Sequence, residues 1–347
     1  MISADELSEP LMGLRKTRLL ASFLFVISAL TACERNPQEL AFSGAALGTS
    51  YHIKVVAAGS PAAGAGLPEL VANLLDDLDH KLSTYKPDSE LNRFNRHPVA
   101  QPFVASDDLY QVLEVADRIY RLSGGAFDPT VRPLVDLWGF GPVDTGDRVP
   151  EESEITALLG EIGFDQIELA AGNQVIRRAP VTLDLSAVAK GFIVDRLVAE
   201  LRARGVDDYM VEIGGEIRVG GRRADGGLWR IAVEAPAGGG VERVLELSDI
   251  SVATSGDYRN YFERDGERYS HTIDPRSGRP IRHRLASVTV LAPTAAEADA
   301  LATALMVMGP GPGFDFAAAN ELAALLLVKE GDGFAELASK AMNAYLH

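Results

Sequence analysis

Asp299 and Thr303 are the first residues of the sequence whose types and spacing suggest chemistry. They are four residues apart in a helix predicted over 294–308, so their side chains share one face of it. A carboxylate and a hydroxyl are oxygen ligands of the kind that a hard cation prefers, and magnesium is the natural candidate. A solvated polar face would show the same spacing, so the pair alone leaves both interpretations open.

A second candidate is the segment 184–195, where a strand predicted over 181–185 meets a helix predicted to be capped by Ser186. Lys190 is disfavoured near a helix start by the helix dipole, and Gly191 costs roughly 0.5–1 kcal/mol relative to alanine within a helix. Both residues fit a helix N-terminus that binds phosphate, because glycine permits close approach. A helix that merely tolerates them is the alternative.

Three further segments combine glycine with polar residues, as binding surfaces do, although ordinary loops share this composition. They are 124–128, 254–258 and 271–280, and His271 in the last is either a site residue or a structural histidine. The sequence contains no Walker A loop, no GxGxxG motif opening a helix, no GxSxG motif and no HExxH motif. Standard nucleotide-binding and protease classes are therefore unsupported.

The composition is that of a folded globular protein with an acidic balance. The chain has 347 residues, of which 47% are hydrophobic and 24% charged, and its formal net charge is −16. Nucleic-acid binding is excluded as a function, because no basic surface is available to neutralise a phosphate backbone. An anionic ligand would need local compensation from a divalent cation or a few placed basic groups.

The N-terminus is predicted to be a targeting segment. A basic stretch over 15–18 precedes a short apolar run over 19–30, and Leu-Thr-Ala-Cys at 30–33 is similar to a bacterial lipobox. Cys33 is the only cysteine, which suits lipid attachment better than a disulfide or a metal site. An ordinary secretory peptide with a coincidental cysteine is the alternative.

These features predict a lipoprotein signal peptide over 1–32, a tether over 33–40 and one domain over 41–347. Acidic residues before Met12 are unusual in a signal peptide, so Met12 is an alternative start. A lipid on Cys33 would place the mature protein on the extracytoplasmic (periplasmic) face of the bacterial cell envelope.

The remaining patterns predict an α+β fold with mixed β-sheets and packed helices, because strands and helices alternate without a regular βα repeat. Helices are predicted over 68–82, 88–95, 106–122, 151–163, 294–308 and 333–344, and after Ser186 with an end at Gly205. Strands are predicted over 42–56, 166–169, 174–176, 209–213 continuing through 216–219, 229–234, 241–247, 287–291 and 322–329.

Eight segments in this order resemble the ApbE family of FAD:protein FMN transferases, from about residue 40 to the C-terminus. The segments are 46–49 (ALGT), 82–85 (LSTY), 124–134, 184–195, 212–215 (EIGG), 254–258 (TSGDY), 271–280 and 298–304 (ADALATA).

The resemblance implies that FAD is the substrate and Mg²⁺ the cofactor. FAD is split at its pyrophosphate, AMP leaves, and FMN is joined through a phosphodiester to a threonine or serine hydroxyl of a target protein. It also implies a flavin-accepting partner, typically a membrane-associated electron-transfer subunit.

The resemblance also assigns site residues. His271 matches a histidine of the transfer step, as base or orienting group, and some family members have an acidic residue in place of Ala302, which implies one more water on the metal here. Asp184 would reach a hydroxyl of FAD or orient Lys190. Magnesium positions match the Ala187 carbonyl, Asp299 and Thr303, and flavin-nucleotide positions match Leu47, Tyr85, Ala126, Phe127, Asp128, Asp184, Lys190 and Ile273.

Two other functions fit the same pocket chemistry. An FAD pyrophosphohydrolase would use water in place of the acceptor hydroxyl, and a flavin-binding lipoprotein would hold FAD without turnover.

Overall fold

The computed structural model describes residues 38–57, 66–141, 148–236, 240–257, 261–264, 266–331 and 333–346. The predicted signal peptide, Cys33 and the first five residues of the predicted tether lie outside the described residues. Within the described ranges, no helix combines the length and apolar character that crossing a membrane requires.

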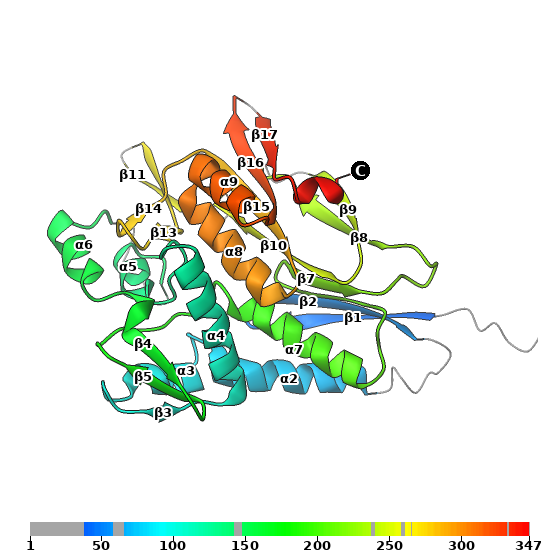
Figure 1. The fold of residues 1–347 in the computed structure, drawn as a ribbon, viewed down its shortest axis with the longest axis horizontal. Helices are drawn as coiled ribbons and strands as arrows, with labels where there is room; N and C mark the ends of the chain where they lie inside the picture. Colours follow the sequence, from blue (N-terminus) through cyan, green and yellow to red (C-terminus); the bar gives the residue numbers. More distant parts are fainter. Residues whose placement is uncertain are drawn as a thin grey trace, which may run out of the picture.

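A twisted sheet of eight strands organises the fold (Figure 1), and each neighbouring pair in it is antiparallel. The strands in sheet order are β1 (Gln38–Ala46), β2 (Thr49–Ala57), β6 (Tyr209–Ile213), β7 (Glu216–Gly220), β10 (Ile250–Gly256), β15 (Leu285–Ala292), β16 (Ala323–Glu330) and β17 (Gly333–Ala338).

One face of this sheet is covered by helices, which share its largest hydrophobic core. Helices α7 and α8 pack directly on the strands and on each other, and the remaining helices pack around them (Figure 1). The helices are α2 (Leu67–Leu82), α3 (Glu90–Arg96), α4 (Asp107–Leu122), α7 (Ala189–Ala203), α8 (Ala295–Met308) and α9 (Pro310–Ala319).

The opposite face is covered by the hairpin of β8 (Trp229–Glu234) and β9 (Val241–Leu247). Alternate residues of β8, including Trp229, Ile231 and Val233, are buried in a second core with alternate residues of the main sheet. The short 3-10 helix η3 (Met342–Ala344) adds Met342 to this core.

Two smaller groups of elements complete the fold. The first, at the left of Figure 1, has its own core of Leu134, Trp138, Ile155, Phe262, Tyr269 and Ile273. It consists of α5 (Arg132–Leu137), α6 (Glu152–Leu159), β11 (Tyr261–Arg264), β12 (Glu267–Ser270), β13 (Ile273–Asp274) and β14 (Arg279–Pro280). The second is the sheet of β3 (Phe103–Val104), β5 (Gln174–Arg177) and β4 (Ile167–Ala170), and the 3-10 helix η2 (Phe164–Gln166) directly precedes β4.

The predicted α+β class is confirmed, and most predicted elements exist. Ser106 caps α4 by accepting the Leu109 N–H, and Thr294 caps α8 by accepting the Glu297 N–H. Gly205 follows α7 with a φ of 74°, as predicted for the residue that ends this helix.

Two predicted single strands are hairpins. The strand predicted over 42–56 is β1 and β2, joined by Leu47 and Gly48 at φ values of 56° and 72°. Likewise β6 does not continue into β7 but turns back at Gly214 and Gly215, with φ values of 61° and 106°. The residues that flank each two-residue turn, Ala46 with Thr49 and Ile213 with Glu216, are cross-strand partners on one face of the sheet, so the alternation of buried and exposed residues shifts by one residue across the turn. The prediction of a single strand missed this shift.

Three other predictions were wrong. The segment 181–185 has its apolar side chains buried, but it pairs with none of the strands in the described ranges. Its hydrogen bonds go instead to the Asn95 side chain, which bonds both backbone groups of Leu183, and to the Pro129 carbonyl. Ser186 is not the cap of α7, which begins at Ala189. The helix predicted over 333–344 is β17 followed by η3, because pairing with β16 overrides the alanine-rich composition.

Candidate active site

A pocket of about 790 Å³ opens where α7, α8, the main sheet and the 271–275 segment meet. It collects most of the residues singled out in the sequence. Those that line it are Tyr85, Ala126, Phe127, Asp128, Asp184, Ala187, Lys190, His271, Ile273, Asp299 and Thr303.

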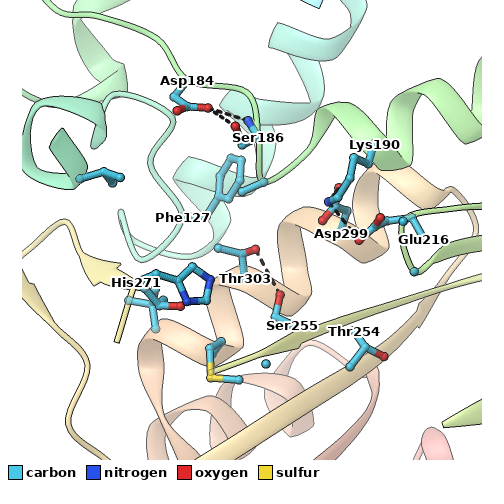
Figure 2. Close-up of a pocket in the computed structure, with 18 of the residues that line it drawn as sticks. Phe127, Asp184, Ser186, Lys190, Glu216, Thr254, Ser255, His271, Asp299 and Thr303 are labelled. Atoms are coloured by element: carbon cyan, nitrogen blue, oxygen red, sulfur yellow. Dashed lines mark hydrogen bonds and ion pairs between the residues drawn. The ribbon is translucent and has the colours of Figure 1, made fainter. Parts of the chain in front are cut away.

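The charged centre of the pocket is Lys190 with two carboxylates (Figure 2). Nζ of Lys190 lies 3.1 Å from Oε1 of Glu216 and 3.6 Å from Oδ2 of Asp299. Both carboxylates are only 4% exposed. One ammonium therefore faces two buried carboxylates and can balance the charge of only one of them.

The pKa values of the three groups respond to this burial. Burial, reinforced by the charge of Asp299, raises the pKa of Glu216 to about 8 against the opposing effect of Lys190. Burial also raises the pKa of Asp299. For Lys190, burial opposes the charged form, but Asp299 and Glu216 outweigh it and raise the pKa above its ordinary value.

Gly191 has a different role from the one predicted. A Cβ on this residue would lie 2.2 Å from the Ala295 carbonyl oxygen and 2.7 Å from the Ala296 nitrogen. Glycine therefore permits the starts of α7 and α8 to touch, rather than leaving room for a phosphate. Its N–H donates to Oδ2 of Asp299 at 3.2 Å, so the close approach also orients that carboxylate.

Asp195 fixes the same helix pair one turn further along α7. Its carboxylate accepts the N–H groups of Ala295 and Ala296 at 3.0 and 2.9 Å. These N–H groups lie in the first turn of α8, where backbone donors have no acceptor inside the helix. Nη1 of Arg218 lies 2.7 Å from the same carboxylate. Nearly all of α8 is buried, so Asp299 and Thr303 project from a central helix and not from an amphipathic surface helix.

The opposite wall of the pocket is built by loops. Oδ1 of Asp184 accepts the backbone N–H of Ser186 at 2.8 Å and the Thr84 hydroxyl at 3.2 Å. Asp184 therefore organises the turn before α7, while the carboxylates paired with Lys190 are those of Glu216 and Asp299. Oδ1 of Asp128 accepts the N–H and hydroxyl of Thr130, and burial raises the pKa of Asp128.

His271 lies across the pocket from Lys190, with Thr303 and Ser255 between them (Figure 2). Its ring meets that of Phe140 edge to face, with centroids 6.4 Å apart. The hydroxyls of Thr303 and Ser255 are 3.3 Å apart. The pocket thus has a charged side and a side with a histidine and aromatic residues, and Tyr85, which is 72% exposed, stands at its edge.

Two expectations do not fit this placement. Leu47 belongs to the β1–β2 turn and does not line the pocket, although Thr49 and Ser50 just after it do. Ala302 is fully buried in the main core and does not line the pocket either.

Glu216 is the site residue that the sequence patterns missed. It was read as the continuation of a strand, because its contact with Lys190 joins distant parts of the chain. The available signal was a carboxylate placed directly after Gly214-Gly215, a pair that marks a tight turn.

The donor set fits a hard cation. In the described part of the chain, no group of three or more His, Cys, Asp or Glu side chains is placed to hold a metal ion. A site here must therefore combine Asp299 with the Thr303 hydroxyl and a backbone carbonyl such as that of Ala187, an all-oxygen set suited to Mg²⁺. A cation at Asp299 would also supply positive charge that lets both buried carboxylates ionise.

Comparison with known proteins gives one consistent result. The model of the ApbE family matches residues 47–326. An FAD:protein FMN transferase of Vibrio cholerae is 44% identical over 320 residues, which are 91% of this chain and 96% of that protein. The FAD:protein FMN transferase of Escherichia coli K12 is 35% identical over 345 residues, 95% of this chain and 97% of that protein.

Comparison with solved structures also identifies ApbE proteins as similar to this chain. The flavinyl transferase ApbE of Pseudomonas stutzeri, in its apo form, superposes with a TM-score of 0.84 at 41% identity, covering 90% of this chain and 98% of that one. The flavin transferase ApbE of Vibrio cholerae gives a TM-score of 0.82 at 42% identity, covering 89% of this chain and all of that one.

Proposed function

Because the chain belongs to the ApbE family, we propose that it is an FAD:protein FMN transferase acting in the pocket between α7 and α8. The observation that carries the proposal is the placement of Lys190 and Asp299 on one side of this pocket, with His271 across from them and Thr303 between. One cavity thereby provides positive charge for binding a pyrophosphate and an imidazole that can accept or orient the proton of an acceptor hydroxyl.

The reaction exchanges one phosphorus–oxygen bond for another. The acceptor hydroxyl oxygen bonds to the FMN-side phosphorus of FAD, and the bond from that phosphorus to the bridging oxygen breaks. AMP leaves with the bridging oxygen and both electrons of that bond, and the hydroxyl proton passes to a base. Such a transfer depends mainly on positioning and on neutralising phosphate charge.

The residues divide this work between the two sides of the pocket. The Lys190 ammonium contacts phosphate oxygens and offsets their charge. Mg²⁺ held by Asp299, Thr303 and the Ala187 carbonyl would supply further positive charge against the pyrophosphate. His271 accepts or orients the proton of the acceptor hydroxyl, and Phe127 and Ile273 provide apolar surface for a planar ring.

The N-terminal sequence supports a proposal for the location, and the family resemblance supports one for the partner. We propose lipid attachment at Cys33, which places the domain on the extracytoplasmic face of the cell envelope. A flavin-accepting protein at the same membrane, such as an electron-transfer subunit, would then be within reach. Mass analysis of the membrane-extracted protein tests the anchor, since a mature N-terminus other than a lipidated Cys33 would contradict it.

The transferase proposal is tested by following both products of FAD cleavage. Purified protein with FAD, Mg²⁺ and a flavin-accepting domain should release AMP in equal amount to the flavin bound covalently, with little free FMN. The Asp299→Ala protein should do neither. Release of free FMN and AMP at the same rate without acceptor would identify a hydrolase instead, and intact FAD after prolonged incubation would identify a binding protein.

A further inference from the structure

Glu216 is a buried carboxylate for which the chemistry above provides no use. It is 4% exposed, and Oε2 is buried without a hydrogen-bond partner among the described residues. Within the described part of the chain, its ion pair is Oε1 with Nζ of Lys190 at 3.1 Å. A carboxylate held in this way destabilises a fold relative to an apolar side chain of the same size, which points to a functional reason for its presence.

The position of Glu216 is fixed by the turn that precedes it. Gly214 and Gly215 form the tight turn between β6 and β7, and a Cβ on Gly214 would lie 2.9 Å from Thr49 Cγ2 and 3.4 Å from Lys190 Cδ. The stem of Lys190 therefore lies over this turn. Glu212 holds the turn by accepting the Gly215 N–H at 2.8 Å, and the other Glu212 oxygen bonds His52 at 2.7 Å.

Lys190 needs such a fixed partner because of its own flexibility. A lysine side chain has four rotatable bonds, and among the residues that the structure describes, the other carboxylate paired with Nζ of Lys190 is that of Asp299 at 3.6 Å. Without Glu216, the ammonium would close onto Asp299, the carboxylate assigned to the metal. The Oε1 contact holds Nζ beside Asp299 and open to the pocket.

We propose that Glu216 is the positioning residue of Lys190, and that it acts on the transfer reaction only through the placement of that ammonium. The inference rests on the proposed function, because Lys190 acts there on the FAD pyrophosphate. A displacement of about 1 Å of a charge that contacts the reacting phosphate is enough to change the rate by up to about a hundredfold.

A double-mutant cycle tests this role. Glu216→Met and Lys190→Met each remove the charge and keep side-chain volume, and kcat and the KM for FAD are measured for both single variants and the double variant. Glu216→Met should lower kcat by about 10- to 100-fold. In the Lys190→Met background, the same change should alter kcat by less than about twofold, because no ammonium remains to be placed.

A conservative variant extends the cycle. Glu216→Gln keeps an oxygen acceptor for Nζ without its charge, so its loss should be smaller than that of Glu216→Met and should also vanish with Lys190→Met. Because Glu216→Gln preserves shape and an acceptor, it serves in place of Glu216→Met if the latter does not fold, as judged by its melting temperature and near-UV circular dichroism.

Glu90 provides the matched control. It is a buried carboxylate outside the pocket, and it accepts the N–H and hydroxyl of Ser106 at 2.6 Å each. Glu90→Gln should lower the melting temperature and leave kcat unchanged with either lysine or methionine at position 190.

The outcomes separate the two proposals. The positioning role is overturned if the fold losses in kcat of the two single variants multiply in the double variant. It is also overturned if folded Glu216→Met keeps full activity. If the unaltered protein releases FMN in place of transferring it, the proposed function fails, and the same cycle measured on FMN release still decides the role of Glu216.

Discussion

The backbone N–H of Gly191 donates to Oδ2 of Asp299 at 3.2 Å, across the contact between the starts of α7 and α8. One contact thus joins the glycine that permits close packing to the carboxylate assigned to the metal. The geometry of the candidate active site consequently depends on how closely these two helices approach, and the first predictions concern that approach.

Gly191→Ala should destabilise the protein and disturb the site. The new methyl group would meet backbone atoms of Ala295 and Ala296, which cannot move aside as a side chain can. We expect a loss of about 1–3 kcal/mol in the free energy of unfolding, typical of overpacking, measured by urea denaturation.

Gly160→Ala is the matched control for this change. Gly160 is exposed at the C-terminal end of α6 with a φ of −77°, and the nearest atom to a Cβ there is the Ala157 carbonyl oxygen at 3.4 Å, an ordinary contact, so alanine should leave stability unchanged or raise it by up to about 1 kcal/mol. Equal effects of the two substitutions would show that the contact between α7 and α8 is not tight at Gly191.

Asp195→Ala should weaken the start of α8. The change removes acceptors for two N–H groups of the first helical turn and leaves the guanidinium of Arg218 without this carboxylate. A charge-assisted hydrogen bond contributes about 1.5–3 kcal/mol, and we expect a loss of that order in the free energy of unfolding. Asp117→Ala, which removes an exposed pair with Arg121, should have no measurable effect, and a comparable loss there would contradict the assignment.

Stability should fall in weak acid in a way that depends on His283. Nε2–H of His283 donates to the Met306 carbonyl at 2.8 Å, and Nδ1 accepts the Leu285 N–H at 3.3 Å, so the fold uses the neutral ring. Burial lowers the pKa of His283 below its ordinary 6.5. The unfolded chain therefore takes up the proton first as the pH falls.

The stabilisation from His283 is thus complete above about pH 6.5 and is lost as the pH falls from there through the folded-state pKa, by up to about 1.4 kcal/mol per pH unit. Urea denaturation at several pH values between about 7.5 and 5 measures this slope. His283→Gln should show a shallower decline than the unaltered protein. Identical slopes would mean that His283 does not titrate between these states.

Magnesium should stabilise the protein through Asp299. Millimolar Mg²⁺ should raise the melting temperature in the absence of FAD, because a ligand that binds only the folded state shifts the unfolding equilibrium. Asp299→Asn keeps an oxygen acceptor for the Gly191 N–H but loses the charge, so its melting temperature should not respond. Asp117→Asn should respond as the unaltered protein does, and an undiminished response of Asp299→Asn would remove Asp299 from the metal site.

The sequence predicted the parts of the site that depend on local spacing. The four-residue interval of Asp299 and Thr303 placed both on one helix face, and both line the pocket. Local spacing could not predict why position 191 requires glycine, because Ala295, which it contacts, is distant in the chain. The same holds for Glu216, whose partner Lys190 lies on another element.

The misassigned elements share one cause. Alternating burial in 181–185 was read correctly, but periodicity does not reveal whether a partner strand or a side chain such as Asn95 takes the backbone hydrogen bonds. In 333–344, local composition favoured a helix, whereas the neighbouring strand β16 decided the outcome.

The most direct test of the proposed FMN transfer is the intact mass of a flavin-accepting protein after incubation with the enzyme, FAD and Mg²⁺. We expect the mass of the acceptor to increase by one FMN less one water, on a threonine or serine, and to stay unchanged with Asp299→Ala. An acceptor of unchanged mass, with AMP and free FMN accumulating in solution, would contradict it.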